Sequence, residues 1–138
     1  MEEIRRMPTF PEDLLYCREH TWVRVDNNIA TIGITDYAQE ELGDILSVKL
    51  TDNDSSVEQD EPFGVIESEK AVVELISPVS GDIIRINEDV SDDLGILNSD
   101  PYDTGWLIVV DIKDMSELDN LLDSYEYSDY VEEEVEVE

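Results

Sequence analysis

The chain contains very little cysteine, histidine or positive charge. Cys17 is the single cysteine and His20 the single histidine, which excludes an internal disulfide and a cysteine-based metal site. Eight lysines and arginines stand against 37 aspartates and glutamates, giving a formal net charge of −29. Such a field repels nucleic acid phosphates and anionic lipid. We therefore expect no nucleic acid and no membrane among the partners, and we favour partners with basic surfaces.

The chain also lacks long hydrophobic runs and the usual catalytic signatures. No apolar run approaches the roughly 20 residues of a membrane-spanning helix, and the N-terminus has no apolar core of a secretory signal, so we expect a cytoplasmic location. No phosphate-binding glycine loop or nucleophile elbow occurs. Cys17 and His20, three residues apart, would point to opposite faces of a strand. A structural role for Cys17 and His20 is favoured over a catalytic pair.

Carboxylates in the loops invite a metal-binding interpretation that the spacing does not support. Residues 52–56 are similar to the start of a calcium-binding loop. Val57, however, stands where that loop needs glycine, and Phe63 stands where it needs a bidentate glutamate. We therefore expect no metal site.

The apolar content of the chain is sufficient for one folded domain. Its 138 residues are 41% hydrophobic, which allows a sizeable core. Many short apolar strands with regular turns predict a mainly β fold, a small sandwich or barrel with minor helices. We divide the chain into an N-terminal arm (1–13), a domain (14–125) and an acidic tail (126–138). The charge density of the tail predicts disorder.

Local patterns predict several individual elements. Val23–Val25 and Ile29–Ile34 are typical of two strands joined by a hairpin turn. Asp36, with Gln39 three residues later, predicts a capping box at the start of a short helix. Ser116 opens a pattern that predicts a helix near the C-terminus.

Lys70 is one of only three lysines, and it lies in a hairpin pattern. Apolar runs before and after it predict two strands, and the polar residues 67–70 predict the tip between them. A lone turn lysine is usually only a solvated group. Here the order strand, Glu-Ser-x-Lys-Ala, strand, Ser-Pro-x-Ser-Gly, strand is far more specific. A lysine that another enzyme modifies must protrude from a rigid turn, so we predict that Lys70 is a modification site.

Motifs along most of the chain carry a resemblance to a known family. They are Tyr16, His20-Thr-Trp22, the run 30–44, the run 64–71, Ser77-Pro-Val-Ser-Gly81, Asn87, Leu97-Asn98, Pro101-Tyr102 and Gly105-Trp-Leu107. At these residues the chain resembles the H protein of the glycine cleavage system, a lipoyl carrier. The resemblance covers residues 14–125 in order.

The resemblance implies a fold, a cofactor and a role. The fold is a lipoyl-domain-like barrel-sandwich hybrid of two antiparallel sheets, with short helices and a C-terminal helix. The cofactor is lipoic acid, joined by an amide to Lys70. The role is that of a non-catalytic carrier in glycine catabolism and one-carbon metabolism, which shuttles the aminomethyl group of glycine on the lipoyl arm.

The resemblance also implies the partners. Glycine decarboxylase (P protein) loads the arm, aminomethyltransferase (T protein) unloads it, and dihydrolipoamide dehydrogenase (L protein) reoxidises the dithiol. A lipoate ligase or an octanoyltransferase would attach the arm. The expected state is a monomer.

The chain departs from the family pattern near the expected site. Thr21 replaces a usual glutamate, Glu69 a usual valine before the lysine, and Glu74 a usual aspartate. By position, Glu19, Thr21 and Glu74 would line the cleft that shelters the loaded arm. A carboxylate would stabilise the protonated amine better than the Thr21 hydroxyl would, because its hydrogen bond is charge-assisted.

Three other functions remain open from the sequence. A lipoate or octanoate relay, donating lipoyl groups to other enzymes, also needs Lys70, and Thr21 slightly favours it. A biotinyl carrier expects methionines flanking the lysine, whereas Glu69 and Ala71 stand here. An unmodified interaction domain would carry no group on Lys70.

Overall fold

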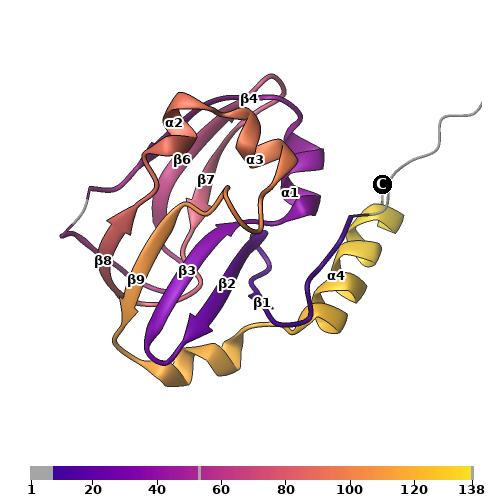
Figure 1. Ribbon diagram of the computed structural model, residues 1–138. Helices are drawn as coiled ribbons and strands as arrows, with labels where there is room; N and C mark the ends of the chain where they lie inside the picture. The colour runs from indigo at the N-terminus through magenta and orange to yellow at the C-terminus, as the bar shows by residue number, and fades with distance from the viewer. Residues whose placement is uncertain (1–7, 53, 138) are drawn as a thin grey trace, which may run out of the picture.

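The structure, a computed structural model, describes residues 8–52 and 54–137, with side chains as far as residue 134. Its strands form two open antiparallel sheets (Figure 1). The six-stranded sheet has the order β1-β2-β3-β9-β8-β5, and the three-stranded sheet the order β4-β6-β7. The strands are β1 Leu15–Tyr16, β2 Thr21–Asp26, β3 Ile29–Ile34, β4 Ile45–Leu50, β5 Ser56–Val57, β6 Pro62–Ser68, β7 Val72–Ile76, β8 Gly81–Ile86 and β9 Ile108–Ile112. The predicted mainly β fold with two antiparallel sheets is confirmed.

The core lies between the two sheets. Ile32 on β3 and Val110 on β9 are fully buried, as are Phe63 and Ile66 on β6 of the other sheet, and all four belong to one apolar cluster. Successive strand residues point to opposite faces, so each sheet contributes one apolar face. Burying those faces against each other holds the two sheets together.

The first hairpin follows the sequence pattern closely. The predicted strands at Val23–Val25 and Ile29–Ile34 correspond to β2 and β3, and β2 extends to both sides of its predicted range. Asp26 pairs with Ile29, so Asn27 and Asn28 close the turn. Asn27 has a φ of 57°, a left-handed conformation that asparagine tolerates better than most residues.

Helix α1 (Asp36–Leu42) follows β3, but its cap differs from the prediction. Thr35 is the N-cap, and its hydroxyl accepts a hydrogen bond from the amide of Ala38. Asp36 is the first helical residue, and its carboxylate accepts from the side-chain amide of Gln39. The predicted Asp36 capping box is therefore wrong by one residue, because the buried Thr35 hydroxyl already holds the free amide.

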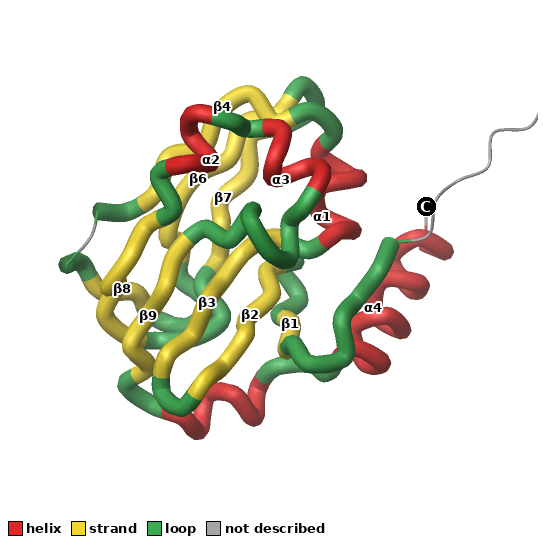
Figure 2. Tube along the Cα trace, viewed as in Figure 1, coloured by secondary structure: helices red, strands yellow, loops and turns green. Residues whose placement is uncertain are grey.

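Short helices connect the later strands (Figure 2). Helices α2 (Asp89–Asp92) and α3 (Gly95–Ser99) lie between β8 and β9. The helix expected from Ser116 is a 3-10 helix, Met115–Asn120, whose N-cap is Asp114. Within the described residues no helix is long and apolar enough to cross a membrane.

The acidic C-terminal segment is a helix, α4 (Ser124–Val137), so the expectation that it is disordered is wrong. Tyr127 and Val131 are both buried. Because they are four residues apart, they lie on one face of the helix. That face packs on the body of the protein and leaves Glu126, Asp129, Glu132 and Glu133 exposed, so its apolar contacts offset the charge repulsion. Glu138 lies outside the described residues.

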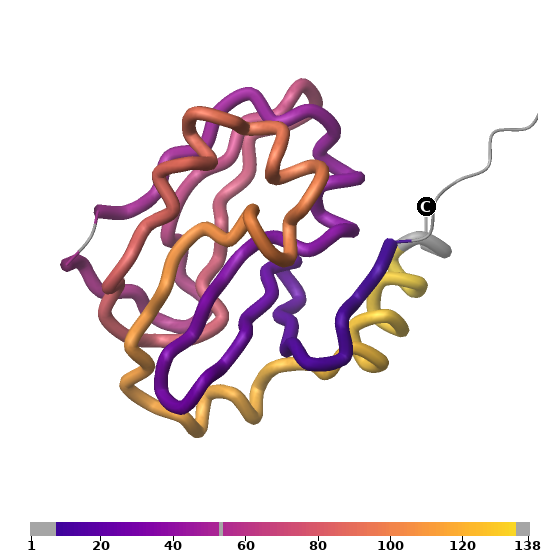
Figure 3. The backbone as a smooth tube through the Cα atoms, viewed as in Figure 1, coloured from indigo at the N-terminus to yellow at the C-terminus, as the bar shows by residue number. Residues whose placement is uncertain are grey.

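The described part of the N-terminal arm runs beside α4 (Figure 3). The ring of Phe10 meets the ring of Tyr127 edge-on at 5.0 Å between centroids. The hydroxyl of Tyr125 donates to the carboxylate of Glu12 at 2.6 Å. Residues 8–13 are thus part of the folded body, whereas residues 1–7 of the predicted arm lie outside the described residues.

Candidate functional site

Lys70 lies in the loop between β6 and β7, at the tip of the hairpin that these strands form. Figure 1 shows the turn of this hairpin at the upper end of the molecule. Glu67 pairs with Val72 as the last ladder pair before the loop. Glu69, Lys70 and Ala71 at the tip are all exposed. Among the described residues Lys70 has no ion-pair partner. Its amine is therefore open to approach by another molecule.

The side chain of Ser68 holds the backbone of this tip. Its hydroxyl oxygen accepts hydrogen bonds from the amides of Lys70 and Ala71, each at 3.1 Å. The hydroxyl in turn donates to the carbonyl of Ala71 at 3.3 Å. Ser68 is only 6% exposed, so water competes little for these bonds. This role of Ser68 was missed at the level of sequence, although a serine at the start of a turn is a known signal for such bonding.

A second connection ties the tip to the end of α1. The amide of Glu69 donates to the carbonyl of Asp44 at 3.1 Å. Gly43 closes α1 with a φ of 73°, a left-handed conformation that glycine adopts without strain. This turn brings Asp44 against the hairpin, so the position of Lys70 depends on α1 as well as on its own strands.

One face of the hairpin anchors it in the core. Ile66 on β6 and Leu75 on β7 are buried. Val65 and Val72 point the other way and are 39% and 66% exposed. The apolar flanks of Lys70 therefore act as anchors on alternate residues only, as expected for strands with one covered face.

The turn after β7 is equally constrained. The hydroxyl of Ser77 donates to the carbonyl of Val79 at 2.7 Å. At Gly81, a Cβ atom would collide with the carbonyl oxygen of Asp111 on the neighbouring strand. The Ser-Pro-Val-Ser-Gly motif thus returns the chain from the three-stranded sheet to the six-stranded one.

Thr21 is not placed to contact a mobile arm. It is 1% exposed, and its hydroxyl donates to the carbonyl of Ile76 at 2.9 Å. The same hydroxyl oxygen lies 2.7 Å from the sulfur of Cys17. Thr21 therefore joins the start of β2 to the end of β7, and in this structure its hydroxyl is already engaged.

Glu19 and Glu74 are both exposed. Glu19 lines a hollow of about 400 Å³ that also involves Cys17 and Asp60. Glu74 lies two residues before Ile76 on β7, opposite Val65. Neither Thr21 nor Glu74 lines that hollow. The three predicted cleft residues thus do not line one pocket: Thr21 and Glu74 lie at or bond to β7, and Glu19 lines the separate hollow.

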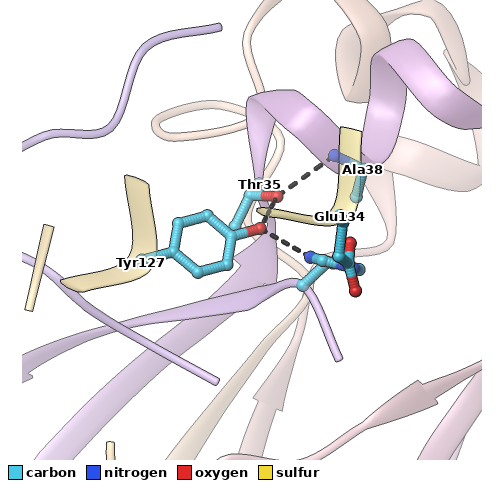
Figure 4. Close-up of polar contacts among 5 residues, drawn as sticks. Thr35, Ala38, Tyr127 and Glu134 are labelled. Atoms are coloured by element: carbon cyan, nitrogen blue, oxygen red, sulfur yellow. Dashed lines mark hydrogen bonds and ion pairs between the residues drawn. The ribbon is translucent and has the colours of Figure 1, made fainter. Parts of the chain in front are cut away.

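His20 takes part in a buried chain of hydrogen bonds that the sequence did not reveal. The hydroxyl of Tyr127 lies 2.8 Å from Nδ1 of His20 and 2.9 Å from the hydroxyl of Thr35. Figure 4 shows this chain continuing from Thr35 to the amide of Ala38. On the other side of the ring, Nε2 lies 3.2 Å from the carboxylate of Glu134. Helix α4 is thereby bonded to the N-cap of α1.

Burial keeps His20 neutral in this chain. Desolvation lowers its pKa below the usual 6.5, although the carboxylates of Glu134, Glu19 and Glu41 act in the opposite direction. A neutral ring that donates from Nε2 to Glu134 leaves Nδ1 to accept from Tyr127. Each hydroxyl in the series from His20 to Ala38 then donates one hydrogen bond and accepts another, and His20 acts as a structural connection.

Comparison with known proteins identifies the family of this chain. The family model of the glycine cleavage H-protein matches residues 14–134. The chain belongs to this family. The glycine cleavage system H protein of Brevibacillus brevis is 48% identical over 124 residues, covering 90% of this chain and 98% of that protein. The mitochondrial glycine cleavage system H protein 2 of Arabidopsis thaliana is 46% identical, covering 89% and 79%.

A solved structure supports the same family assignment. A glycine cleavage system H protein from Mycobacterium marinum superposes with a TM-score of 0.77 at 31% identity, covering 91% of this chain and 98% of that one. As a member of the family, the chain is a carrier subunit of the glycine cleavage system and not itself a catalyst. Its family carries lipoate, and the P, T and L proteins are the partners that membership implies. The comparisons do not favour the relay alternative.

Proposed function

We propose that the amine of Lys70 carries the lipoyl group through an amide bond, and that this arm transports the aminomethyl group between the partner enzymes. The proposal rests on the structure of the hairpin tip. The backbone amides of Glu69, Lys70 and Ala71 are all hydrogen-bonded, whereas the Lys70 side chain is exposed. A rigid base with a free side chain is what a swinging arm requires.

The attachment needs a lipoate ligase or an octanoyltransferase. The neutral Lys70 amine attacks an activated acyl carbonyl, the activating group leaves with its electron pair, and the nitrogen loses a proton. The amide removes one of the few positive charges of the chain. Once attached, the arm raises the effective concentration of its cargo at each partner, as tethering generally does.

Intact mass spectrometry of protein from lipoate-replete cells tests the attachment. We expect a mass increase of one lipoic acid less one water, mapped to the peptide that contains Lys70, and no increase in Lys70→Ala. Lys49→Ala is the matched control, because Lys49 is an exposed lysine on β4 of the same sheet. An unmodified wild type, or a modified Lys70→Ala, would contradict the proposal.

We also propose that Glu19 and Glu74 help to hold the protonated aminomethyl group of the loaded arm, and that Thr21 does so only through the backbone it positions. Both glutamates are exposed, Glu74 on β7 and Glu19 at the hollow beside Cys17, so each carboxylate is free to form a charge-assisted bond. Glu74→Gln and Glu19→Gln should speed the spontaneous loss of the aminomethyl group. Glu88→Gln, an exposed glutamate after β8, should not. Equal rates in all variants would refute the assignment.

The monomeric state is a further proposal. It is supported by the net charge of −29, because like charges oppose self-association. Light scattering coupled to size-exclusion chromatography, at low and at physiological salt, measures the molar mass in solution. We expect the mass of one chain, and twice that mass would contradict the proposal.

A further inference from the structure

The Lys70 hairpin closes in an uncommon way. Two-residue hairpin loops usually adopt primed turns, which need positive φ and therefore favour Asn-Gly or Gly. The hairpin at Asn27 follows this rule, with a φ of 57°. Within the described residues Glu69 and Lys70 both keep negative φ, since the positive values fall on His20, Asn27, Asp54, Asp60 and Gly43. The tip thus holds a lysine where a tight hairpin would ordinarily demand glycine or asparagine.

The Ser68 hydroxyl makes this turn possible. It accepts from the Lys70 and Ala71 amides, taking the role that a backbone carbonyl has in a primed turn. The amide of Ser68 donates to the Ala71 carbonyl at 2.8 Å and completes the closure. Serine and threonine hydroxyls form such local turns. Because Ser68 is nearly buried, the bonds fix where the Lys70 side chain leaves the backbone.

We infer that Ser68 is the positioning residue for acylation of Lys70, an inference that rests on the proposed function. Ser68 does not touch the reacting atoms. It presents the Lys70 amine on a backbone that is already ordered when the acylating enzyme binds. The donor is an activated lipoyl or octanoyl group, such as an acyl adenylate. Its carbonyl carbon forms the new bond to the Lys70 nitrogen while the bond to the adenylate breaks, AMP leaves with the electron pair and the nitrogen releases a proton.

Losing the Ser68 hydroxyl should weaken the binding of this protein to the acylating enzyme. Without it, the Lys70 and Ala71 amides lose their acceptor and the tip samples several conformations. Ordering the tip must then occur within the enzyme complex, and this cost is set against the binding free energy. The KM for this protein should therefore rise while kcat at saturation is retained.

The experiment measures initial rates of acylation against the concentration of this protein, using a purified lipoate ligase with lipoate and ATP. Ser68→Ala removes the hydroxyl, and Ser68→Thr keeps it. Ser47→Ala is the matched control, because Ser47 is on the neighbouring strand and its hydroxyl bonds instead to the Glu67 carboxylate. Amide hydrogen exchange at Lys70 and Ala71 provides a readout that does not depend on the enzyme.

We expect kcat/KM to fall about tenfold in Ser68→Ala through KM, the equivalent of ordering roughly one residue, with faster exchange at Lys70 and Ala71. Ser68→Thr and Ser47→Ala should behave as wild type does. Wild-type kcat/KM in Ser68→Ala, or an equal loss in Ser47→Ala, would overturn the inference and leave the proposed function standing. A wild type that is not acylated at all would instead overturn the proposed function itself.

Discussion

At the scale of single residues, the environment of Thr21 changes how the site is understood. The resemblance to the H-protein family suggested that Thr21 makes a polar contact with the arm. The structure instead buries Thr21 and directs its hydroxyl to the Ile76 carbonyl. Its role in this structure is to hold β7 against β2.

Thr21→Val should therefore lower stability. The substitution preserves volume but leaves the Ile76 carbonyl without its donor, which costs about 1–2 kcal/mol. Chemical denaturation of the two proteins measures this difference. The control Thr31→Val, at a half-buried position on β3, should change stability by less than about 0.5 kcal/mol. Equal effects at both positions would show that the Thr21 bond contributes nothing.

His20 predicts a dependence of stability on pH. Its folded pKa lies below 6.5 because of burial, so near and below that pH the unfolded chain binds more protons than the folded one. Stability should consequently fall as the pH drops below 6.5. His20→Asn removes the titration and suits the backbone, because His20 has a φ of 72° and asparagine tolerates that conformation.

Denaturation curves between pH 7.5 and pH 5 measure this effect as the difference between wild type and His20→Asn. That difference cancels much of the titration of the many carboxylates, which both proteins share. The wild type should lose its advantage over the variant as the pH falls. An advantage that grows toward low pH would mean that the Glu134 carboxylate raises the pKa of His20 more than burial lowers it.

At the scale of elements, α4 is held by one buried polar chain and a few apolar contacts. The ring of Tyr127 stacks on the ring of Tyr16 at 4.7 Å between centroids. Its hydroxyl bonds to Thr35 and His20, so a single side chain connects the helix to the residue before β2 and to the N-cap of α1. The helix depends on these contacts, because the carboxylates along it repel one another.

Tyr127→Phe should loosen α4. The change leaves the Thr35 hydroxyl and the His20 ring each without a buried partner, at a cost of about 1–3 kcal/mol. Tyr125→Phe is the matched control on the same helix, since Tyr125 is 69% exposed. Hydrogen exchange along 124–134 should quicken in Tyr127→Phe alone. Unchanged exchange there would show that the apolar face suffices to dock α4.

At the scale of the whole molecule, 37 acidic residues against eight lysines and arginines leave most carboxylates without a cation to pair with. Among the residues that the structure describes, Lys113 pairs with Asp82 at 3.4 Å, whereas the contact of neutral His20 with Glu134 is a hydrogen bond. The Lys113 pair is well exposed and contributes little. Repulsion among carboxylates should therefore oppose folding at low ionic strength.

Raising the salt concentration should consequently raise the melting temperature. At about 0.15 M salt the screening length is about 8 Å, against about 30 Å at 0.01 M, so repulsion between distant carboxylates is largely removed. Calorimetry in increasing sodium chloride, with sucrose as a neutral control, measures the effect. A melting temperature that falls with salt would show that attractive pairs dominate.

The parts of the fold with strong local signals could be predicted. The hairpin at Asn27, the strands around Lys70 and the exposed tip all follow from short patterns of polarity and turn residues. Helix α4 could not be predicted, because the charge density of the segment favours disorder. Its order depends on Tyr127 and Val131 meeting partners from distant parts of the chain.

The candidate site shows the same division. The sequence by itself placed Lys70 at the tip of a hairpin and carried the motifs of the H-protein family, because turn chemistry and motif order are local properties; that Lys70 bears the lipoyl group remains our proposal. Only the tertiary structure decided that Thr21 is buried, that Asp44 supports the tip, and that His20 joins α4 to α1. Those relations are contacts between residues far apart in the chain, and burial is fixed only when the strands and helices pack together.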